Sequence, residues 1–337
     1  MGEYARSLAI ARAVAERWPA AQIRFVLSSQ APYIDDVPFP VSRLPASATF
    51  HTAEVIETLR EYRPDAVVFD NAGRTAQLRF AKSQGAAVIF ISARDRQRRR
   101  AFRFRWMRLI DELWIAYPKF AAGELSWLER FKLNLVGAPK VRYLDVIGRS
   151  DGEPLPQSIA ARIASRPLVL WVPGGGTGHP GVQDAVQRFV EAARRVAASG
   201  RLCVVVGSEA DETDPELVRL SRLPQSQLLA LMGQAQLVVA NGGATLLQAV
   251  ARAVACVAVP IAKDQPKRIA HCVAAGVTRA ARLEATDMAR VVESLLADEA
   301  ARRAMTERSL ALKLADGTAV AVAALEERLQ GKGGMNA

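Results

Sequence analysis

The chain has 337 residues, of which 50% are hydrophobic and 23% are charged, and its formal net charge is +11. This length suits two domains, and the composition excludes a disordered chain. No apolar run approaches the roughly 20 residues that span a bilayer, and the N-terminus, which carries acidic Glu3, lacks the apolar core of a signal peptide. Three scattered cysteines exclude a disulfide framework or a zinc site and indicate a reducing compartment. We therefore expect a cytoplasmic protein, either free or at the inner face of the membrane.

The positive charge is concentrated in the first half of the chain. Residues 1–150 hold 24 Lys and Arg against 15 Asp and Glu, whereas the remainder holds 21 against 19. An acidic partner should therefore meet the first half.

Apolar strands and amphipathic helices alternate along the first half. A helix is expected over 5–18, a strand over 22–28, a proline-rich loop over 31–48 and a helix over 51–62. Then follow a strand over 65–70, a helix over 74–85, a strand over 86–92, an arginine-rich helix over 94–110 and a strand over 112–117. This order is typical of an open parallel sheet. Such a domain normally begins with a central strand, which is missing here, so we expect a start further upstream or a lost first strand.

A polar, proline-containing segment separates the first half from a second alternating region. The predicted strands there cover 167–173, 201–207, 236–240 and 256–260, and the helices cover 181–198, 225–233 and 265–275, with more helices from 286. We assign residues 1–148 to an N-terminal domain, 149–166 to a linker and 167–330 to a C-terminal domain. The expected fold is α/β, with two doubly wound Rossmann-like domains facing a central cleft.

Two glycine-rich loops in the second half each join a predicted strand to a helix. The first is "GGGTGHPG" (174–181) and the second opens "NGGATLLQAV" (241–250). Such loops permit close approach of a phosphate to free backbone N–H groups, or they are simply tight turns. Neither has the lysine of a P-loop, and the dinucleotide fingerprint fails at His179. Kinase and dehydrogenase functions are therefore disfavoured.

The segment from "NGGATLLQAV" to the proline-ended strand and Asp264-Gln265 resembles the donor-binding domain of GT-B glycosyltransferases. It is most similar to the family that adds N-acetylglucosamine to the lipid-linked peptidoglycan precursor, the MurG family. The resemblance covers about residues 165–280, and the first half matches by topology only. It implies a GT-B fold and a nucleotide-diphospho-sugar donor, most simply UDP-linked, with no metal and no cofactor.

The resemblance also assigns residues to the donor site. Thr245 matches a family threonine, Gln248 takes the place of an acidic residue, and Asp264-Gln265 match the sugar-contacting pair. An amide accepts fewer ribose hydroxyls than a carboxylate, so Gln248→Glu is expected to tighten nucleotide binding. The remaining expected contacts are Gly174, Gly175, Gly176, Thr177, Ser208, Gly242, Gly243 and Ala244.

An inverting enzyme of this type needs a general base in its first domain. Glu3 and Asp70 are the candidates, although Glu3 could equally be an acidic residue favoured by a helix dipole and Asp70 a helix cap. His51 and His271 are expected to be structural, and His179 could touch phosphate.

The segment 94–110 carries eight arginines and one acid, Asp95. As a helix it would place Phe102, Trp106 and Ile110 on one face. Unneutralised arginines attract phosphate, and an aromatic, basic helix can lie on an anionic membrane. The expected acceptor-binding residues are Arg96, Arg99, Arg100 and Arg103.

We therefore expect a glycosyltransferase, of the hexosyl or N-acetylhexosaminyl type, acting on an anionic, lipid-linked or envelope glycan. Peripheral membrane contact is expected with it, and nucleic acid is a lesser alternative because no RNA-binding motif accompanies the arginines. The alternative functions are a nucleotide-sugar hydrolase or epimerase of the same fold and a non-catalytic binding protein.

Overall fold

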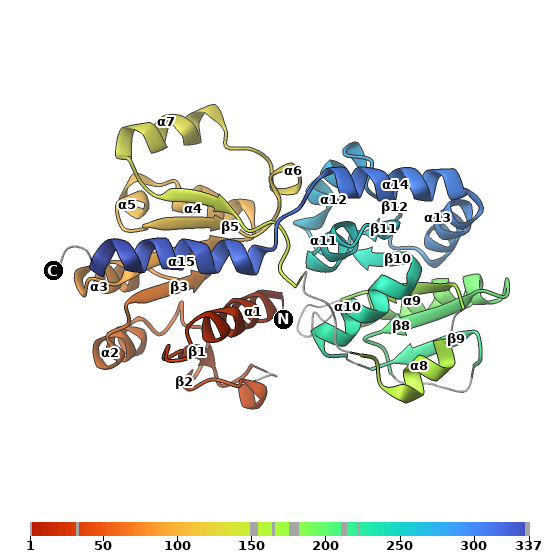
Figure 1. The fold of residues 1–337 in the computed structure, drawn as a ribbon, viewed down its shortest axis with the longest axis horizontal. Coiled ribbons are helices and arrows are strands. Elements are labelled where there is room, and N and C mark those ends of the chain that lie inside the picture. The colour runs from red at the N-terminus through yellow and green to blue at the C-terminus, as the bar shows by residue number, and fades with distance from the viewer. Residues whose placement is uncertain are drawn as a thin grey trace. The chain divides into compact units, whose positions relative to one another are not determined.

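A computed structural model describes residues 2–31, 34–148, 154–163, 166–174, 182–209, 214–221 and 223–333. The described residues form two compact units, which are taken one at a time (Figure 1). The N-terminal unit contains Glu3–Tyr117, Gly123–Leu144 and the chain from Thr318 onward. The C-terminal unit contains Pro118–Ala122 and Asp145–Gly317.

The larger sheet of the N-terminal unit has four parallel strands in the order β3-β4-β5-β6. These strands are β3 (Ala66–Asp70), β4 (Ala87–Ser92), β5 (Glu112–Ile115) and β6 (Lys140–Tyr143). Strands β4 and β5 are buried along their whole length, as their apolar runs predict for parallel strands covered on both faces. Because Asp70 pairs with Ile91, the carboxyl ends of β3 and β4 lie at one edge.

A separate parallel pair, β1 (Phe25–Ser28) and β2 (Val41–Leu44), forms the second sheet of this unit. The first described element is helix α1 (Gly2–Arg17), and no described strand joins β1 to β3. The side chains of β1 are all partly exposed, and β3 is also less buried than β4, as expected of sheet edges. Among the described residues, the unit therefore has the parallel strands and intervening helices of a doubly wound domain, divided between two sheets.

The core around Leu78, Phe90 and Trp106 is joined by helices α2 (Thr52–Tyr62), α3 (Thr75–Ser83), α4 (Asp95–Ala101), α5 (Phe104–Met107) and α7 (Trp127–Val136). The unit also contains α1, the short 3-10 helix η1 (Ile34–Asp36) and α15 (Gly317–Gly333).

The arginine-rich segment forms two short helices, so the expectation of one continuous helix over 94–110 was wrong. Helix α4 ends at Ala101 with Phe102 as its C-cap, and Arg103 is extended with ψ of 132° before α5 begins. The break lets both Phe102 and Trp106 enter the core, where each is buried, and Trp106 lies edge-on to Phe90 with ring centroids 5.2 Å apart. The apolar face was therefore predicted correctly, although the helix was not.

The C-terminal unit is built on one six-stranded parallel sheet in the order β12-β11-β10-β7-β8-β9. Its strands are β7 (Leu168–Val172), β8 (Leu202–Val206), β9 (Leu217–Leu220), β10 (Ala235–Asn241), β11 (Cys256–Val259) and β12 (Arg279–Ala280). The chain runs from β7 outward to β9, returns to β10 beside β7, and then runs outward the other way. The strand order therefore reverses between β7 and β10, which is the place where open α/β sheets bind ligands.

Five helices contact this sheet, namely α9 (Val182–Ala197), α10 (Gln225–Gln234), α11 (Ala244–Ala251), α12 (Gln265–Ala274) and α13 (Ala285–Ala297). The described part of the unit also contains α6 (Lys119–Ala122), which packs on α12, α8 (Gln157–Ile163), and α14 (Glu299–Ala311), which packs on α11 and α13. The core on one face joins α9 and α13 to the sheet through Trp171, Phe189, Met288 and Leu295, all fully buried.

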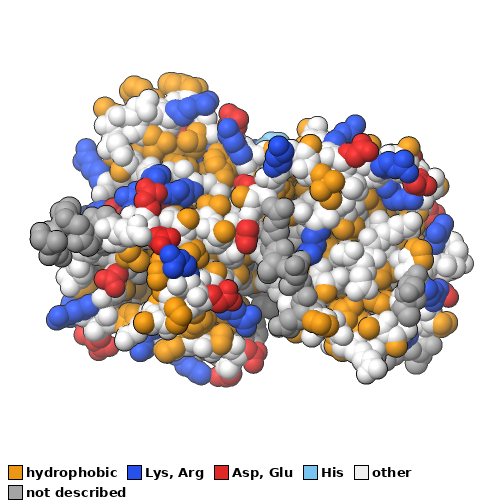
Figure 2. Space-filling view, in the orientation of Figure 1, with side chains coloured by type: hydrophobic (Ala, Val, Ile, Leu, Met, Phe, Trp, Pro, Cys, Tyr) orange, Lys and Arg blue, Asp and Glu red, His pale blue; other side chains and the backbone are white. Residues whose placement is uncertain are grey.

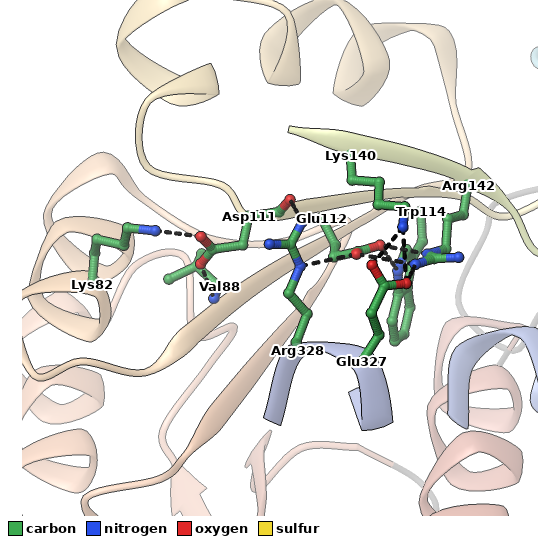
Figure 3. A network of polar contacts seen from close by, with 9 residues as sticks. All are labelled: Lys82, Val88, Asp111, Glu112, Trp114, Lys140, Arg142, Glu327 and Arg328. Carbon is green, nitrogen blue, oxygen red and sulfur yellow. Dashed lines mark hydrogen bonds and ion pairs between the residues drawn. The ribbon is translucent and has the colours of Figure 1, made fainter. Parts of the chain in front are cut away.

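The last helix, α15, belongs to the N-terminal unit, whereas the sequence analysis placed residues up to 330 in the C-terminal domain. The cause is a charged network at the start of β5 (Figure 3). The fully buried carboxylate of Glu112 accepts hydrogen bonds from Arg328 Nε (3.0 Å), Arg142 Nε (2.8 Å) and the Trp114 indole (3.1 Å). A buried carboxylate is costly unless paired, so Glu112 requires the guanidinium that α15 brings.

Candidate functional site

The carboxyl ends of β7 and β10 place Pro173 and Gly174, where the first glycine loop begins, beside the second glycine loop in the C-terminal unit. Ala240 pairs with Val172, so the strands end in register. The first loop leaves β7 through Pro173 and Gly174, and the second is Gly242-Gly243, leading into α11. This is the edge at which the strand order reverses, as the sequence analysis expected of a binding site.

Asn241, at the end of β10, holds the two loops together. Its Nδ2 donates to the Pro173 carbonyl (3.0 Å), and its Oδ1 accepts from the Gly243 N–H (2.7 Å). The side chain is buried, so these bonds satisfy groups that water cannot reach. The sequence analysis passed over Asn241, although a polar residue closing an apolar strand just before two glycines is a usable signal.

The second loop has room for no larger residue than glycine. A Cβ on Gly242 would lie 2.7 Å from the Ile269 side chain, and one on Gly243 would lie 2.5 Å from Asn241 Oδ1. Gly243 caps α11, and no side chain caps the helix, Thr245 included. The first backbone N–H groups of α11 are therefore the groups available to an anion at this edge.

Three of the expected donor contacts are engaged within the protein. Gln265 is buried, and its Oε1 accepts from the N–H groups of Ile261 (2.8 Å) and Ala262 (3.3 Å). Gln248 is buried and donates to the Ile147 carbonyl (3.0 Å). Asp264 pairs with Arg268 Nη2 (3.2 Å), although its side chain stays partly exposed.

Arg268 is a residue that the sequence analysis missed. Its buried guanidinium donates through Nη1 to the Gly242 carbonyl (2.5 Å) and so fixes the position of the second glycine loop. Its position one turn after Asp264 on α12 could have indicated the pair.

The other expected donor residues divide into described and undescribed positions. Gly174 adopts the left-handed region with φ of 101°, Ser208 follows β8 and is half-buried, and Ala244 is exposed. Gly175, Gly176 and Thr177 lie outside the described residues, as does His179.

The N-terminal unit brings both candidate bases to the carboxyl end of β3. Asp70 is nearly buried, and its two oxygens accept from Arg6 Nε (3.1 Å), Arg6 Nη2 (2.5 Å) and Ser7 Oγ (2.9 Å). Burial raises the pKa of Asp70, and the adjacent Arg6 guanidinium opposes that rise. Glu3 is half-exposed and accepts from Asn71 Nδ2 (2.8 Å). The two carboxylates thus differ, because Asp70 is engaged on both oxygens and Glu3 faces solvent.

The loop after β3 is fixed by the next residue. Asn71 adopts φ of 55°, and its Oδ1 accepts from the Ala93 N–H (2.8 Å) after β4. Asn71 therefore orients Glu3 from a rigid position. Arg94 Nη2 lies 3.8 Å from the same Glu3 oxygen.

The four expected acceptor-binding arginines lie on and beside α4. Arg100 stacks 4.1 Å from the centre of the Trp106 ring and donates to the Gly73 carbonyl (2.6 Å). The pKa of Arg100 is lowered, first by burial and then by the positive charges of Arg74, Arg103 and Arg96. These guanidinium groups therefore repel one another, and an anion would relieve that repulsion. Arg99 is exposed.

The two described histidines have structural partners. His51 Nδ1 contacts Glu54 (3.0 Å), and His271 Nδ1 contacts the Ala121 carbonyl (3.0 Å). His51 makes no side-chain cap at the start of α2. Neither group is a candidate base.

No family model and no curated protein matches this sequence. Solved structures do match it along nearly its whole length. With spinosyn forosaminyltransferase SpnP the TM-score is 0.71 at 13% identity, covering 98% of this chain and 97% of that one. The calicheamicin glycosyltransferase CalG4 gives 0.66 at 17% identity, covering 97% and 95%. MurG of Acinetobacter baumannii gives 0.61 at 16% identity, covering 97% and 96%.

These neighbours share two Rossmann-like domains. The chain has the GT-B fold. The GT-B fold that the sequence resemblance implies is therefore confirmed. Because the identities are low, these similarities show the fold alone. Within the part of the chain that the structure describes, no helix has the length and apolar character needed to cross a membrane.

Proposed function

We propose that this GT-B-fold protein is a metal-independent glycosyltransferase. It would move a sugar from a nucleotide-diphospho-sugar, most simply UDP-linked, to a hydroxyl of an anionic glycan or lipid-linked acceptor. The observation that carries the proposal is the junction at the point where the strand order reverses, at which Asn241 bonds to Pro173, just before the first glycine loop, and to Gly243 of the second.

The donor site would use backbone groups for the diphosphate. The N–H groups at the start of α11 have no side-chain cap, and the helix dipole favours negative charge there. Thr245, in the first turn, offers a hydroxyl. Asp264 would take the sugar hydroxyls, because it is the accessible member of the Asp264-Gln265 pair. Gln265 and Gln248 would hold the backbone around the donor site in place without contacting the donor, since their amides already bond to backbone groups.

The acceptor hydroxyl would lose its proton to Glu3. Its carboxylate is accessible and oriented by Asn71, whereas Asp70 already holds Arg6 and Ser7. The hydroxyl would then attack the anomeric carbon, and the nucleoside diphosphate would depart. Asp70 is the alternative base, and in the favoured version it positions α1 through Arg6.

The arginines of α4 would bind the anionic part of the acceptor. Arg96, Arg99, Arg100 and Arg103 present guanidinium groups suited to phosphate or carboxylate. The mutual repulsion at Arg100 supports an anionic occupant.

A melting experiment tests the donor half of the proposal. Among UDP, GDP, CDP and TDP, one nucleotide should raise the melting temperature, since a ligand at about 100 times its Kd adds about 2.7 kcal/mol. Gly242→Ala should abolish the shift because the new Cβ meets Ile269. Gly233→Ala is the control, because its Cβ would meet nothing closer than 4.0 Å. No shift with any nucleotide or nucleotide sugar would refute the proposal and favour a non-catalytic binding protein.

A second candidate is a hydrolase or epimerase acting on the nucleotide sugar itself. It is favoured by a match to a putative UDP-N-acetylglucosamine 2-epimerase of Listeria monocytogenes, with a TM-score of 0.63 at 13% identity. Such an enzyme would turn over its donor at full rate without any acceptor. A glycosyltransferase would instead accelerate when a lipid-linked or glycan acceptor is added, and Glu3→Gln would remove that acceleration without changing nucleotide binding.

A further inference from the structure

Helix α12 begins beside the second glycine loop of the C-terminal unit. Strands β10 and β11 are parallel neighbours, and Asn241 pairs with Val259, so the loop after β10 and the turn before α12 leave the same edge of the sheet. Asp264 directly precedes α12 but makes no side-chain cap on it. Its carboxylate instead accepts from Arg268 Nη2 (3.2 Å), one turn further along the helix.

Arg268 joins this carboxylate to the glycine loop. Nη1 of the same guanidinium donates to the Gly242 carbonyl (2.5 Å), and the side chain is 7% exposed. A guanidinium is planar and rigid, so its two bonds fix the Gly242 carbonyl relative to the Asp264 carboxylate. A lysine, whose charge is one point on a flexible stem, could not hold both groups in this way.

The peptide unit that joins Gly242 to Gly243 is held at both of its ends. Its C=O accepts from Arg268, and its N–H donates to Asn241 Oδ1 (2.7 Å). Ile269 closes the remaining space, because a Cβ on Gly242 would lie 2.7 Å from its side chain. The N–H groups at the start of α11 are therefore set in place before an anion arrives, and less ordering is needed when it binds.

The two members of the ion pair differ in their contact with solvent. The Asp264 side chain is 39% exposed, so water screens it more than the buried guanidinium of Arg268, and it stays accessible to a ligand. Exposed arginines on α13 and α14 have acids beside them, as at Arg290 and Arg303, and Figure 2 shows the two charges interspersed over these helices. Arg268 is therefore a buried cation at a candidate anion site, and it is distinct from this mixed surface charge.

We infer that Arg268 is a positioning residue through which the donor site selects a nucleotide-diphospho-sugar over a bare nucleoside diphosphate. It keeps the Asp264 carboxylate at a fixed place relative to the loop that binds the diphosphate. Sugar hydroxyls then meet the carboxylate as soon as the diphosphate is bound. Arg268 itself acts through Asp264 and Gly242. The inference rests on the donor site of the proposed function.

A purely structural Arg268 leads to a different expectation. If the guanidinium only held α12 against the sheet, its loss would weaken the binding of nucleotide and nucleotide sugar by the same factor. If it aligns Asp264 with the glycine loop, its loss removes mainly the extra affinity that the sugar contributes. The Kd of UDP divided by the Kd of UDP-N-acetylglucosamine, here called the sugar ratio, separates the two roles.

Calorimetric titration of the full chain with UDP and with UDP-N-acetylglucosamine measures the sugar ratio, and GDP with GDP-mannose is the second pair of probes. Arg268→Met keeps the apolar stem and removes both bonds. It should lower the sugar ratio by about tenfold or more, because the hydrogen bonds of the sugar to a charged carboxylate are no longer aligned. Arg268→Lys keeps the charge but should lower the ratio nearly as much, because one ammonium cannot hold both groups.

Two further variants complete the experiment. Arg302→Met is the matched control, because Arg302 of α14 also donates to backbone carbonyls of this unit, those of Leu295 and Leu296, and it should leave the sugar ratio unchanged. Asp264→Ala, at a partly exposed side chain, should lower the ratio about as much as Arg268→Met, and the double variant should lower it no further. Melting temperatures show which variants fold, and Asp264→Ala keeps the test decisive if the Arg268 variants do not.

The possible results separate the inference from the proposed function. Equal losses of affinity for UDP and UDP-N-acetylglucosamine in Arg268→Met would overturn the inference and leave the proposed function standing. A wild-type sugar ratio in Arg268→Lys or in Asp264→Ala would overturn it as well. A wild-type protein that binds no nucleotide or nucleotide sugar contradicts the proposed function, and the inference is lost with it.

Discussion

The two units differ in the polar contacts that hold their helices and loops on the sheet. In the C-terminal unit, a complete six-stranded sheet ends in a neutral hydrogen-bonded junction, where Asn241 joins the first glycine loop to the second. In the N-terminal unit, which has a divided sheet, charged pairs do the same work. Arg6 ties α1 to β3 through Asp70, and Arg328 ties α15 to β5 through Glu112.

This difference has energetic consequences. Buried ion pairs add little net stability when intact, because desolvation offsets attraction, but breaking one leaves an uncompensated charge. A neutral junction costs less to break. The N-terminal unit should therefore be the more sensitive of the two to loss of a single polar group.

The largest effect is expected for Arg328→Met. It removes one of the two guanidinium partners of the fully buried Glu112 and the anchor of α15. We expect a loss of about 3–5 kcal/mol in the free energy of unfolding, measured by urea denaturation. Arg303→Met, at an exposed arginine of α14, is the control and should change less than about 1 kcal/mol. Equal effects of the two variants would refute the role of the network.

A smaller effect is expected for Asn241→Ala. It leaves the Pro173 carbonyl and the Gly243 N–H without partners in a buried place, which costs about 1–3 kcal/mol. Nucleotide binding should fall together with stability. Asn241→Asp keeps the acceptor for Gly243 but sets a buried carboxylate oxygen against the Pro173 carbonyl, so it should destabilise the protein at least as much as Asn241→Ala. A stable Asn241→Ala variant with unchanged nucleotide binding would contradict the role of the junction.

Gln248→Glu tests whether Gln248 contacts the nucleotide or only supports the fold of the C-terminal unit. The sequence alone predicted tighter nucleotide binding, but Gln248 donates to the Ile147 carbonyl, and a carboxylate would repel it. We now expect about 1–2 kcal/mol of destabilisation and no gain in affinity. Calorimetric titration with the nucleotide that binds wild type decides between the two outcomes, since tighter binding would restore the first interpretation.

The smallest effect concerns the thiols, which report on one unit alone. Cys203, Cys256 and Cys272 all lie buried in the C-terminal unit, and burial raises the pKa of each to about 12. Each thiol is therefore neutral at pH 7, and a thiol reagent should label it only when the unit opens. In Arg328→Met the labelling rate should stay close to that of wild type, because the damage lies in the other unit. A strong increase would show that the units open together.

Much of the fold could be predicted from the sequence because the apolar runs of the strands and the amphipathic spacing of the helices are both strong. The runs at 66–70, 87–92, 168–172 and 202–206 are apolar except for Asp70 and Ser92 at their ends, and each forms a strand of a parallel sheet. The single helix over 94–110 was predicted wrongly. The spacing of apolar residues does not show that the chain must break after α4 for both Phe102 and Trp106 to be buried in one core.

The same reasoning from the sequence predicted only part of the candidate site. The glycine loops and the end of β3 follow from topology, because parallel strands bring their carboxyl ends together. The inward orientation of Gln265 and Gln248 could not be predicted, because their partners are backbone groups of Ile261, Ala262 and Ile147. A sequence motif shows which residue type is present. It does not show whether that side chain is already hydrogen-bonded to another part of the protein.

The sequence by itself determined the fold class, the two glycine loops and the positive first half, because periodicity, glycine and charge are local properties of the chain. Only the tertiary structure decided that α15 joins the N-terminal unit, that Asp70 is engaged while Glu3 is accessible, and that Arg268 joins Gly242 to Asp264. These depend on contacts between residues far apart in sequence. Burial and pairing, which set the energy of a charge or an apolar side chain, exist only once the chain has folded.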